Sequence, residues 1–175
     1  MSNTIKCLID FIALAIVYFI FFFPKWKIQG KSRLMINTVM YVYLSFVLYF
    51  TLMPIITSLP FIFNHPYVPM HMQPFDDYFS GRGDSERQIL LNVIMMVPFG
   101  FLLPLVKKRR LGSCVLAVFL FSLGIELVQP LINGSRSSDI TDVITNTTGG
   151  ILGYGLYLLF RPFMDTVIKH LSPQQ

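Results

Sequence analysis

Seven polar side chains in this sequence have the types and spacing needed to bind a charged ligand. They are three carboxylates, one guanidinium and three amides: Glu126, Asp139, Asp142, Arg136, Asn92, Gln129 and Asn146. A guanidinium can hold a phosphate or carboxylate group through two parallel hydrogen bonds. Carboxylates can accept hydrogen bonds from a ligand, transfer protons or bind a divalent cation, and amides supply neutral hydrogen bonds. These seven are the candidate ligand-binding residues, and no metal ligand or cofactor is predicted.

The spacing of these residues predicts that they share helix faces. Glu126 and Gln129 are three positions apart, so they lie on one face of a helix. After a short link, Asp139, Asp142 and Asn146 follow at offsets of 3 and 7, which trace one stripe along a second helix. Two neighbouring helices would therefore present polar groups near the link that joins them.

Glycines continue the second stripe beyond its polar part. Gly149 and Gly153 are four positions apart, a GxxxG spacing that lets another helix approach closely. The motif is common, and packing is its ordinary role. We therefore interpret these glycines as a helix contact and not as part of the site.

Composition predicts the elements that must position the polar residues. Of the 175 residues, 54% are hydrophobic and 13% are charged, against about a quarter charged in soluble domains. One soluble core of this size could not bury so much apolar surface, so the surplus must face lipid. We predict an all-α, polytopic membrane helix bundle that forms a single membrane domain over residues 1–175.

About five apolar segments are long enough to cross a bilayer, which requires about 20 residues each. The predicted spans are Ile5–Pro24, Leu34–Ser58, Gln88–Val106, Leu111–Ile132 and Ile140–Phe160. The one substantial loop is Leu59–Arg87, whose prolines and glycines disfavour a long helix.

The basic residues predict the orientation of the bundle. Ten of the fourteen lysines and arginines fall in the first link, the third link and the C-terminal tail. Positively charged links stay in the cytoplasm, so we predict a multi-pass protein of the cell membrane. Its N-terminus is predicted outside the cell and its C-terminus in the cytoplasm. Because the basic residues follow the span ends, the net charge of +5 does not indicate a nucleic-acid partner.

This orientation places the polar residues together. Asn92 falls in the outer turns of its span, and Glu126 lies roughly 9 Å below the outer end of its own, at 1.5 Å per residue. Intramembrane polar residues are costly, so they are functional candidates by default. The sequence predicts that side chains from three spans converge beneath the outer lipid boundary.

Structural interpretations of the same residues remain open. Asp139 could cap the last helix, and Arg136 could pair only with Asp142. Asn146 could bond to a neighbouring helix. Glu126 is the hardest to explain in this way, because a buried acid needs a partner, and Arg136 is the nearest candidate in sequence.

Longer patterns resemble one family of bacterial membrane proteins. Glu126-x-x-Gln129, a short link, Arg136-x-x-Asp139-x-x-Asp142-x-x-x-Asn146-x-x-Gly149-Gly150-x-x-Gly153 resembles the signature of the VanZ-like family. Upstream, Asn92-Val93-x-x-x-x-Pro98-Phe99-Gly100-Phe101-x-x-Pro104 and Gln73-Pro74-Phe75 resemble two further family elements. The resemblance covers about residues 44–160 and leaves the first span outside its strongest part.

The resemblance implies a protein of the bacterial cell membrane with a role in resistance to the glycopeptide antibiotic teicoplanin or in maintenance of the cell envelope. Our leading hypothesis is a non-catalytic site at the outer leaflet, in which Arg136 meets an anionic group. Membrane lipids, a lipid-linked wall precursor and a lipoglycopeptide are the candidate partners. The sequence sets no oligomeric state.

Two other functions are considered. An intramembrane enzyme could act on an envelope lipid or wall precursor with Glu126, Asp139 and Asp142 as acid and base groups. The serines of the link, Ser135, Ser137 and Ser138, have no histidine nearby in sequence, although folding could bring His71 close. A scaffold or small transporter is the third alternative, but no internal repeat of the transporter kind is visible.

Overall fold

The protein is built almost entirely of α-helices. The computed structural model describes residues 2–64, 66–134 and 136–171. Five helical segments in this part are long and apolar enough to cross a membrane. They are Asn3–Ile28 (α1, Asn3–Val17; the π-helical turn η1, Tyr18–Phe22; α2, Phe23–Ile28), Lys31–Thr51 (α3), Ser85–Val106 (α5), Leu111–Ile132 (α6) and Ile140–Leu171 (α7). The predicted all-α membrane bundle of about five spans is confirmed.

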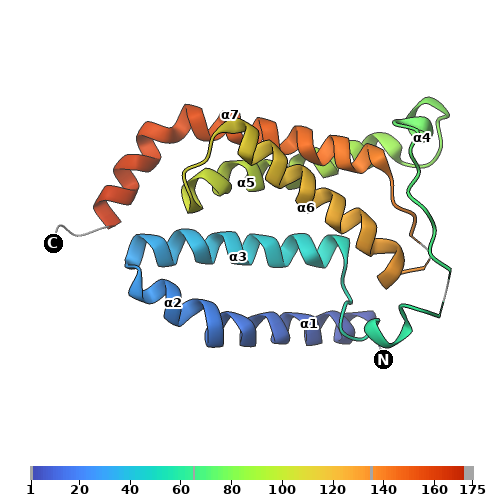
Figure 1. Ribbon diagram of the computed structural model, residues 1–175, viewed down its shortest axis with the longest axis horizontal. Helices are drawn as coiled ribbons and strands as arrows, with labels where there is room; N and C mark the ends of the chain where they lie inside the picture. The colour runs from blue at the N-terminus through green and yellow to red at the C-terminus, as the bar shows by residue number, and fades with distance from the viewer. Residues whose placement is uncertain (1, 65, 135, 172–175) are drawn as a thin grey trace.

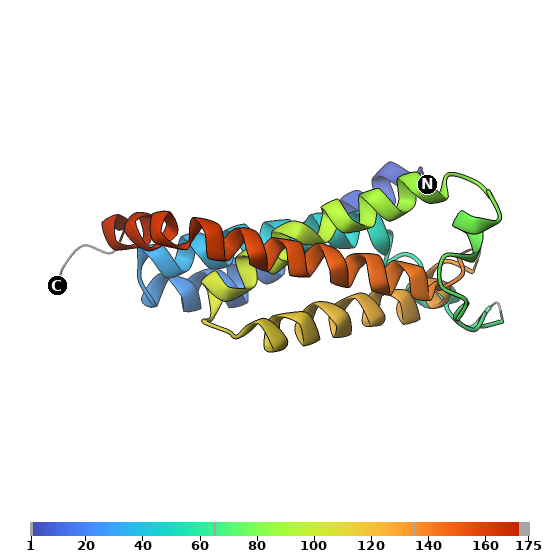
Figure 2. The same cartoon turned by 90° about the horizontal axis from the view of Figure 1, so that it is seen from above.

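The spans run back and forth along one axis, so their links gather at two ends (Figure 1). One end holds the N-terminus, the loop 52–84 and the link 133–139, and we call it the site end (Figure 2). The other end holds the links 29–30 and 107–110 and the last turns of α7, and we call it the basic end. The predicted polar residues and the basic clusters therefore lie at opposite ends.

Prolines explain where the observed helices differ from the predicted ones. The second span ends at Thr51 and not at Ser58, because Pro54 has no backbone N–H and its ring disfavours helix at the residue before it. The first span continues past Pro24 to Ile28. Pro24 comes just after the π-helical turn η1, an irregularity in the helix that accompanies the loss of a backbone donor.

The remaining boundaries agree or extend further. α6 has the predicted limits, and α5 begins three residues earlier than Gln88. α7 continues from Phe160 to Leu171 with Pro162 inside it. In its described part the long loop contains two short helices, Leu59–Phe61 (η2, a 3₁₀ turn) and Asp76–Phe79 (α4), and no long one, as the prolines and glycines predict.

α5 and α7 pack against each other through the predicted glycine stripe. A Cβ built on Gly149 would overlap the carbonyl oxygen of Val93, and one on Gly153 would overlap that of Val97. The two backbones are therefore in direct contact along this stretch. This contact places the polar end of α7 beside the first turns of α5, as the packing interpretation requires.

The first span forms an outer layer against α3. Figure 1 shows α1 and α2 on the side of α3 that faces away from α5, α6 and α7. The Tyr18 hydroxyl hydrogen-bonds the Thr38 hydroxyl at 2.8 Å, and the Tyr41 hydroxyl donates to the Leu14 carbonyl at 2.7 Å. Tyrosine side chains thus fix the first span to the second.

Large apolar side chains cover the outer faces of the spans. Phe19 and Phe21 of the first span and Leu159 and Phe163 of α7 are each more than 60% exposed. Isolated exposed hydrophobic residues are normal in soluble proteins, but continuous coverage of long helices fits lipid as the solvent. The protein is a multi-pass membrane protein.

Candidate functional site

Six of the seven predicted residues line one cavity of about 790 Å³ at the site end. They come from three helices and one link: Asn92 of α5, Glu126 and Gln129 of α6, Arg136 of the link, and Asp142 and Asn146 of α7. Residues separated by more than 50 positions in sequence are thus brought to one place. Their role in binding a ligand stays a prediction.

Besides these polar residues, the cavity is lined by side chains of α3 and α5, and we call it the lateral groove. At its inner end the two helices touch, because the Tyr43 hydroxyl donates to the Met95 carbonyl at 2.7 Å. Nearer the site end, Phe46 and Phe50 of α3 and Ile94 of α5 line the groove and are more than half exposed. A polar interior is therefore reached past apolar side chains on the lipid-facing surface.

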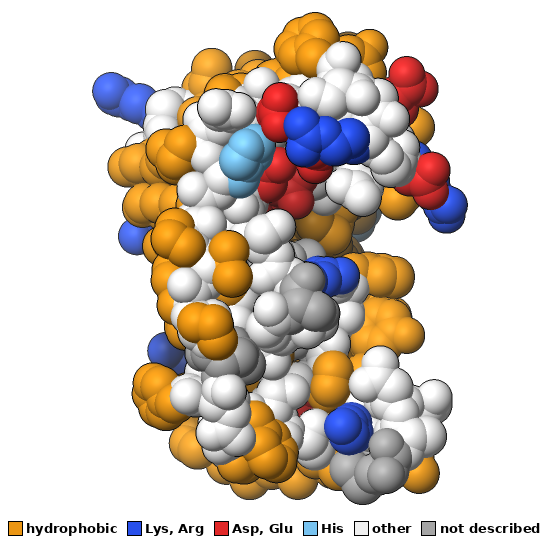
Figure 3. Space-filling model, turned by 90° about the vertical axis from the view of Figure 1, so that its right-hand side faces the viewer, with side chains coloured by type: hydrophobic (Ala, Val, Ile, Leu, Met, Phe, Trp, Pro, Cys, Tyr) orange, Lys and Arg blue, Asp and Glu red, His pale blue; other side chains and the backbone are white. Residues whose placement is uncertain are grey.

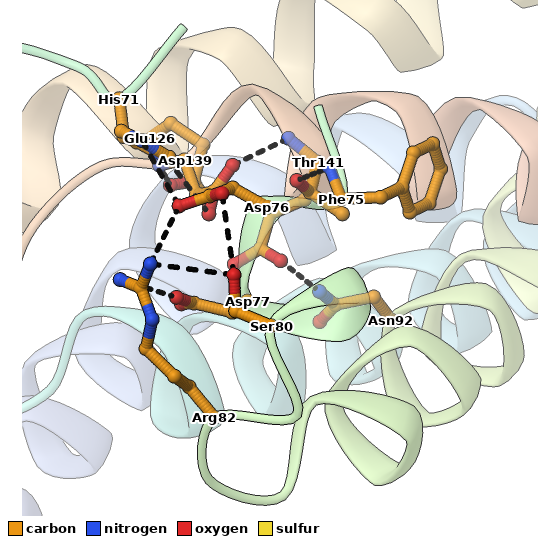
Figure 4. Close-up of polar contacts among 11 residues, drawn as sticks. His71, Phe75, Asp76, Asp77, Ser80, Arg82, Asn92, Glu126, Asp139 and Thr141 are labelled. Atoms are coloured by element: carbon orange, nitrogen blue, oxygen red, sulfur yellow. Dashed lines mark hydrogen bonds and ion pairs between the residues drawn. The ribbon is translucent and has the colours of Figure 1, made fainter. Parts of the chain in front are cut away.

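Asn92 and Asp142 join two walls of the groove. The Asn92 Nδ2 donates to Asp142 Oδ1 at 2.7 Å, and Figure 4 shows this bond reaching up from α5. A hydrogen bond to an ionised carboxylate is shorter and stronger than one between neutral groups. The pair thus fixes the first turn of α7 against α5 and leaves the second carboxylate oxygen of Asp142 without a protein donor among the described residues.

Glu126 ties the end of α6 to the start of α7. The residue is only 2% exposed, and its Oε2 accepts from the Asp139 backbone N–H at 3.1 Å. Its backbone carbonyl accepts from the buried Ser138 hydroxyl. The link between the helices therefore folds back over the last turns of α6, and Glu126 has a backbone partner in place of the arginine predicted from sequence.

Arg136 makes no ion pair with the acids around it, which corrects the pairing considered with Asp142 or Glu126. Within the described ranges, no carboxylate oxygen lies within 4.0 Å of its guanidinium. Its Nη1 instead donates to the Thr51 carbonyl at 3.0 Å, and Gln129 Nε2 donates to the same oxygen at 3.3 Å. Thr51 is the last residue of α3, so its carbonyl has no acceptor role within the helix. Arg136 is exposed and lines the groove, so its guanidinium can meet a ligand there.

Asp139 is the predicted residue that does not line the groove. Its Oδ1 accepts from the Thr141 N–H at 2.7 Å, so it caps α7 as the structural interpretation proposed. Its Oδ2 lies 3.8 Å from His71 Nδ1. Asp139 therefore lies beside the groove, and it lines a small neighbouring cavity together with Asp142. The three acids stay close together, but only Glu126 and Asp142 line the groove.

The loop between α3 and α5 is held onto the start of α7 by its own network (Figure 4). The His71 N–H donates to the Ser138 carbonyl at 2.9 Å, and the Phe75 N–H donates to Thr141 Oγ1 at 2.9 Å. Phe75 has a φ of 59°, a left-handed conformation that is unusual for a bulky residue. The Pro-Phe element therefore marks the place where the loop docks on α7.

Charged side chains of the loop gather on the outer surface of this end. Arg82 lies 3.2 Å from Asp76 and 3.5 Å from Asp77, and His71 Nε2 lies 3.9 Å from Asp76. Figure 3 shows acidic, basic and histidine side chains together on this face, with hydrophobic side chains at its edges. In the part of the chain that the structure describes, no group of three or more His, Cys, Asp or Glu side chains is arranged to hold a metal ion.

The two described serines of the link, Ser137 and Ser138, show no hydrogen bond to a histidine that would activate them as nucleophiles. Ser135 lies outside the described residues. The Ser138 hydroxyl is used by the Glu126 carbonyl, and the His71 ring faces Asp76 and Asp139. Among the described residues, no side-chain hydrogen bond joins His71 to Ser137 or Ser138.

Sequence reasoning missed Asp10, a second buried acid at the site end. Asp10 lies in α1 and is only 3% exposed. Its two carboxylate oxygens accept from the N–H groups of Ile55 and Ile56 at 2.6 and 2.9 Å. These amides follow the end of α3, so Asp10 fixes the turn behind the Thr51 carbonyl. An acid within an apolar span was the signal that could have identified it.

Replacing Asp10 with asparagine is expected to destabilise the protein by about 2 kcal/mol. A charge-assisted hydrogen bond contributes about 1.5–3 kcal/mol, and the asparagine NH₂ would face one of the two backbone donors. Thermal unfolding in detergent measures the change as a loss of several degrees in Tm. Asp84→Asn is the control, because Asp84 precedes α5 without a side-chain cap bond. Equal Tm values for the two variants would show that Asp10 does not anchor the turn.

Comparisons with known proteins agree with the family resemblance of the sequence patterns whose residues line the groove. The profile of the family described as VanZ/LLP1 matches residues 10–161, which include every residue of the groove. The chain belongs to the VanZ/LLP1 family. Protein VanZ of Enterococcus faecium is 37% identical to it over 106 residues, which is 59% of this chain and 62% of VanZ. The chain thus spans less than two thirds of that relative, and no solved structure matches it.

The family match also bears on the first span. The profile begins at residue 10, within α1. It therefore covers Asp10 and most of the first span, which lay outside the strongest part of the resemblance found in the sequence. The VanZ/LLP1 pattern thus includes both the groove and the anchor behind it.

Proposed function

We propose that this VanZ/LLP1 protein binds the anionic head group of an amphiphile from the outer leaflet of the bacterial cell membrane. The observation that carries the proposal is the position of Arg136. Its exposed side chain lines a groove that also carries exposed apolar side chains, and no carboxylate oxygen of the described residues lies within 4.0 Å of its guanidinium. A phosphate or carboxylate there could form two charge-assisted hydrogen bonds.

The shape of the groove supports an amphiphile as the ligand. A volume of about 790 Å³ lies in the range of small-molecule sites. A head group would lie among Arg136, Gln129 and Asn92, while its chains would leave past Phe50 and Ile94 into the bilayer. A soluble anion would gain nothing from those apolar contacts.

The charge distribution supports an outward-facing groove. Lys25, Lys27, Lys31 and Arg33, together with the run from Lys107 to Arg110, lie about the basic end. By the positive-inside rule that end is cytoplasmic, which puts the groove in the outer leaflet, the N-terminus outside and the C-terminus in the cytoplasm.

Three ligands share the required chemistry: a phospholipid, a lipid-linked wall precursor and a lipoglycopeptide such as teicoplanin. Each combines an anionic polar part with a lipid chain at the same interface. Occupation of the groove by any of them would connect the protein to glycopeptide resistance or to envelope maintenance. The family membership supports this role, and the mass of the bound molecule would distinguish the three.

Native mass spectrometry of the protein in gentle detergent tests the proposal. Wild-type protein is expected to carry an amphiphile adduct, and Arg136→Ala should reduce its abundance at least tenfold, about 1.4 kcal/mol. Arg87→Ala is the matched control, since Arg87 is an exposed arginine near the same end that does not line the groove. Adding teicoplanin to the delipidated protein tests in the same way whether the antibiotic itself binds. Adducts of equal abundance on Arg136→Ala and wild type would contradict the proposal.

A further inference from the structure

The innermost amide of the lateral groove has an unpaired oxygen. Asn146 is only 2% exposed and lines the groove. Its Nδ2 donates to Ser122 Oγ at 2.8 Å, which confirms the interpretation of Asn146 as a bond between helices. Its Oδ1 has no hydrogen-bond partner within the described part of the chain. Buried acceptors are nearly always satisfied, so this oxygen indicates a donor that the protein does not supply.

The missing donor can come from the groove. Asn146 lies one helical turn beyond Asp142, which is about 6 Å deeper at 1.5 Å per residue. Its amide rotates about χ2, a soft torsion without sharp minima. Oδ1 is itself covered in this structure, so a rotation about χ2 is needed to bring it to the cavity that the side chain lines.

Two carboxylates beside Asn146 have spare acceptor capacity. Glu126 Oε2 accepts one backbone N–H and Asp142 Oδ1 accepts one amide N–H, although a carboxylate has about four acceptor sites. Among the residues described, no Lys, Arg or His nitrogen lies within 4.0 Å of either carboxylate. We call Glu126, Asp142 and Asn146 the groove floor. Among the described residues, its acceptor sites outnumber the donors that reach them, and its two carboxylates have no basic side chain in direct contact.

We propose that the groove floor binds a primary ammonium group carried by the head group of a membrane lipid. An ammonium has three N–H donors and one positive charge, which match three acceptor side chains with excess negative charge. This inference rests on the proposed function, because the same head group would present its phosphate to Arg136. The ligand is then a zwitterionic amino-phospholipid.

The chemistry separates this ligand from its close analogues. A quaternary ammonium carries the same charge but has no N–H, so it would leave the Asn146 oxygen unpaired. A polyol head group supplies donors but no positive charge for Glu126 and Asp142. A site built to accept hydrogen bonds rejects analogues that lack the donor, because its buried polar groups are left unpaired.

Titration of the delipidated wild-type protein with two short-chain lipids tests the inference. The probes are dihexanoyl phosphatidylethanolamine and dihexanoyl phosphatidylcholine, which differ only in the three N-methyl groups, and native mass spectrometry counts the adducts. We expect the ethanolamine lipid to bind at least tenfold more tightly. The preference should fall below about twofold in Asn146→Leu and in Asp142→Asn. Thr148→Val is the control on the exposed face of α7, and it should keep the wild-type preference.

The outcomes separate this inference from the proposal on which it rests. Equal binding of the two lipids by wild-type protein, with both lost in Arg136→Ala, would overturn ammonium recognition and support the anion site alone. Binding of neither lipid, or binding that Arg136→Ala does not change, would overturn both. A preference that survives in Asn146→Leu and Asp142→Asn would also overturn the assignment to the groove floor.

Discussion

Gly153→Ala is expected to destabilise the bundle by about 3 kcal/mol. The added Cβ would overlap the Val97 carbonyl oxygen and would lie 2.9 Å from the Phe101 backbone nitrogen. Both obstacles are backbone atoms of α5, so no side-chain rotation can relieve them. Overpacking a close contact typically costs about 1–3 kcal/mol, and more where the backbone must move. α5 and α7 would have to separate, which would also pull Asn92 away from Asp142.

Gly155→Ala is the matched control for this substitution. A Cβ on Gly155 of the same helix meets nothing within 4 Å, and alanine favours a helix over glycine by up to about 1 kcal/mol. Thermal stability measured by size-exclusion chromatography after heating should therefore fall for Gly153→Ala and stay unchanged or rise for Gly155→Ala. Parallel behaviour of the two variants would mean that the α5–α7 contact is looser than described.

Arg136→Ala is expected to abolish any resistance to teicoplanin that the protein confers on a sensitive bacterial host. Removing one partner of a desolvated, hydrogen-bonded charge pair costs about 2–5 kcal/mol, which corresponds to a loss of ligand affinity of about 30-fold or more. Membrane abundance should stay unchanged, because Arg136 is exposed and the Thr51 carbonyl keeps Gln129 as a donor. The minimal inhibitory concentration and an immunoblot of membranes measure the two effects.

Two further variants distinguish a loss of ligand binding from a loss of protein stability. Arg136→Lys keeps the charge but loses the forked geometry, so intermediate resistance is expected. Arg87→Ala should behave as wild type. Resistance that follows membrane abundance across all three variants would show that Arg136 acts only on stability.

The sequence predicts the spans well because apolar length and charge at the ends are local properties. α6 has the predicted limits, and the glycine stripe of α7 packs as its spacing indicates. The errors arise where local rules compete. Leu52 to Ser58 are apolar enough to continue a span, but Pro54 ends the helix first, and α7 continues through Pro162 into its basic tail.

The site is predictable in its location but not in its pairings. Depth along each span is enough to bring Asn92, Glu126 and Asp142 to the same level. The partners of Arg136 and Glu126 are backbone groups, the Thr51 carbonyl and the Asp139 N–H. Backbone partners of this kind cannot be predicted from residue types. Side-chain pairing by charge therefore gives the wrong partner for Arg136.

The roles of Asp139 and Asp10 could not be predicted from the sequence either. Asp139 is predicted to line the site and does not line the groove, whereas Asp10 is not predicted and lies near it. Asp139 belongs to the polar stripe by spacing, yet its carboxylate caps α7 and faces His71. Asp10 is not part of a polar stripe in its span, yet its carboxylate accepts hydrogen bonds from two backbone N–H groups near the groove. In both cases the irregular segments around the helix ends decide the role, and their paths depend on tertiary structure.

The central claim is that the lateral groove receives a lipid between α3 and α5. Photo-crosslinking with a phospholipid that carries a diazirine next to its head group tests it most directly, with the attachment sites mapped by peptide mass spectrometry. Attachment is expected at Phe46, Phe50, Leu91 and Ile94, and Arg136→Ala should reduce it at least tenfold. Attachment spread evenly over lipid-facing positions such as Leu158 and Leu159, and equal in the Arg136→Ala variant, would contradict the claim.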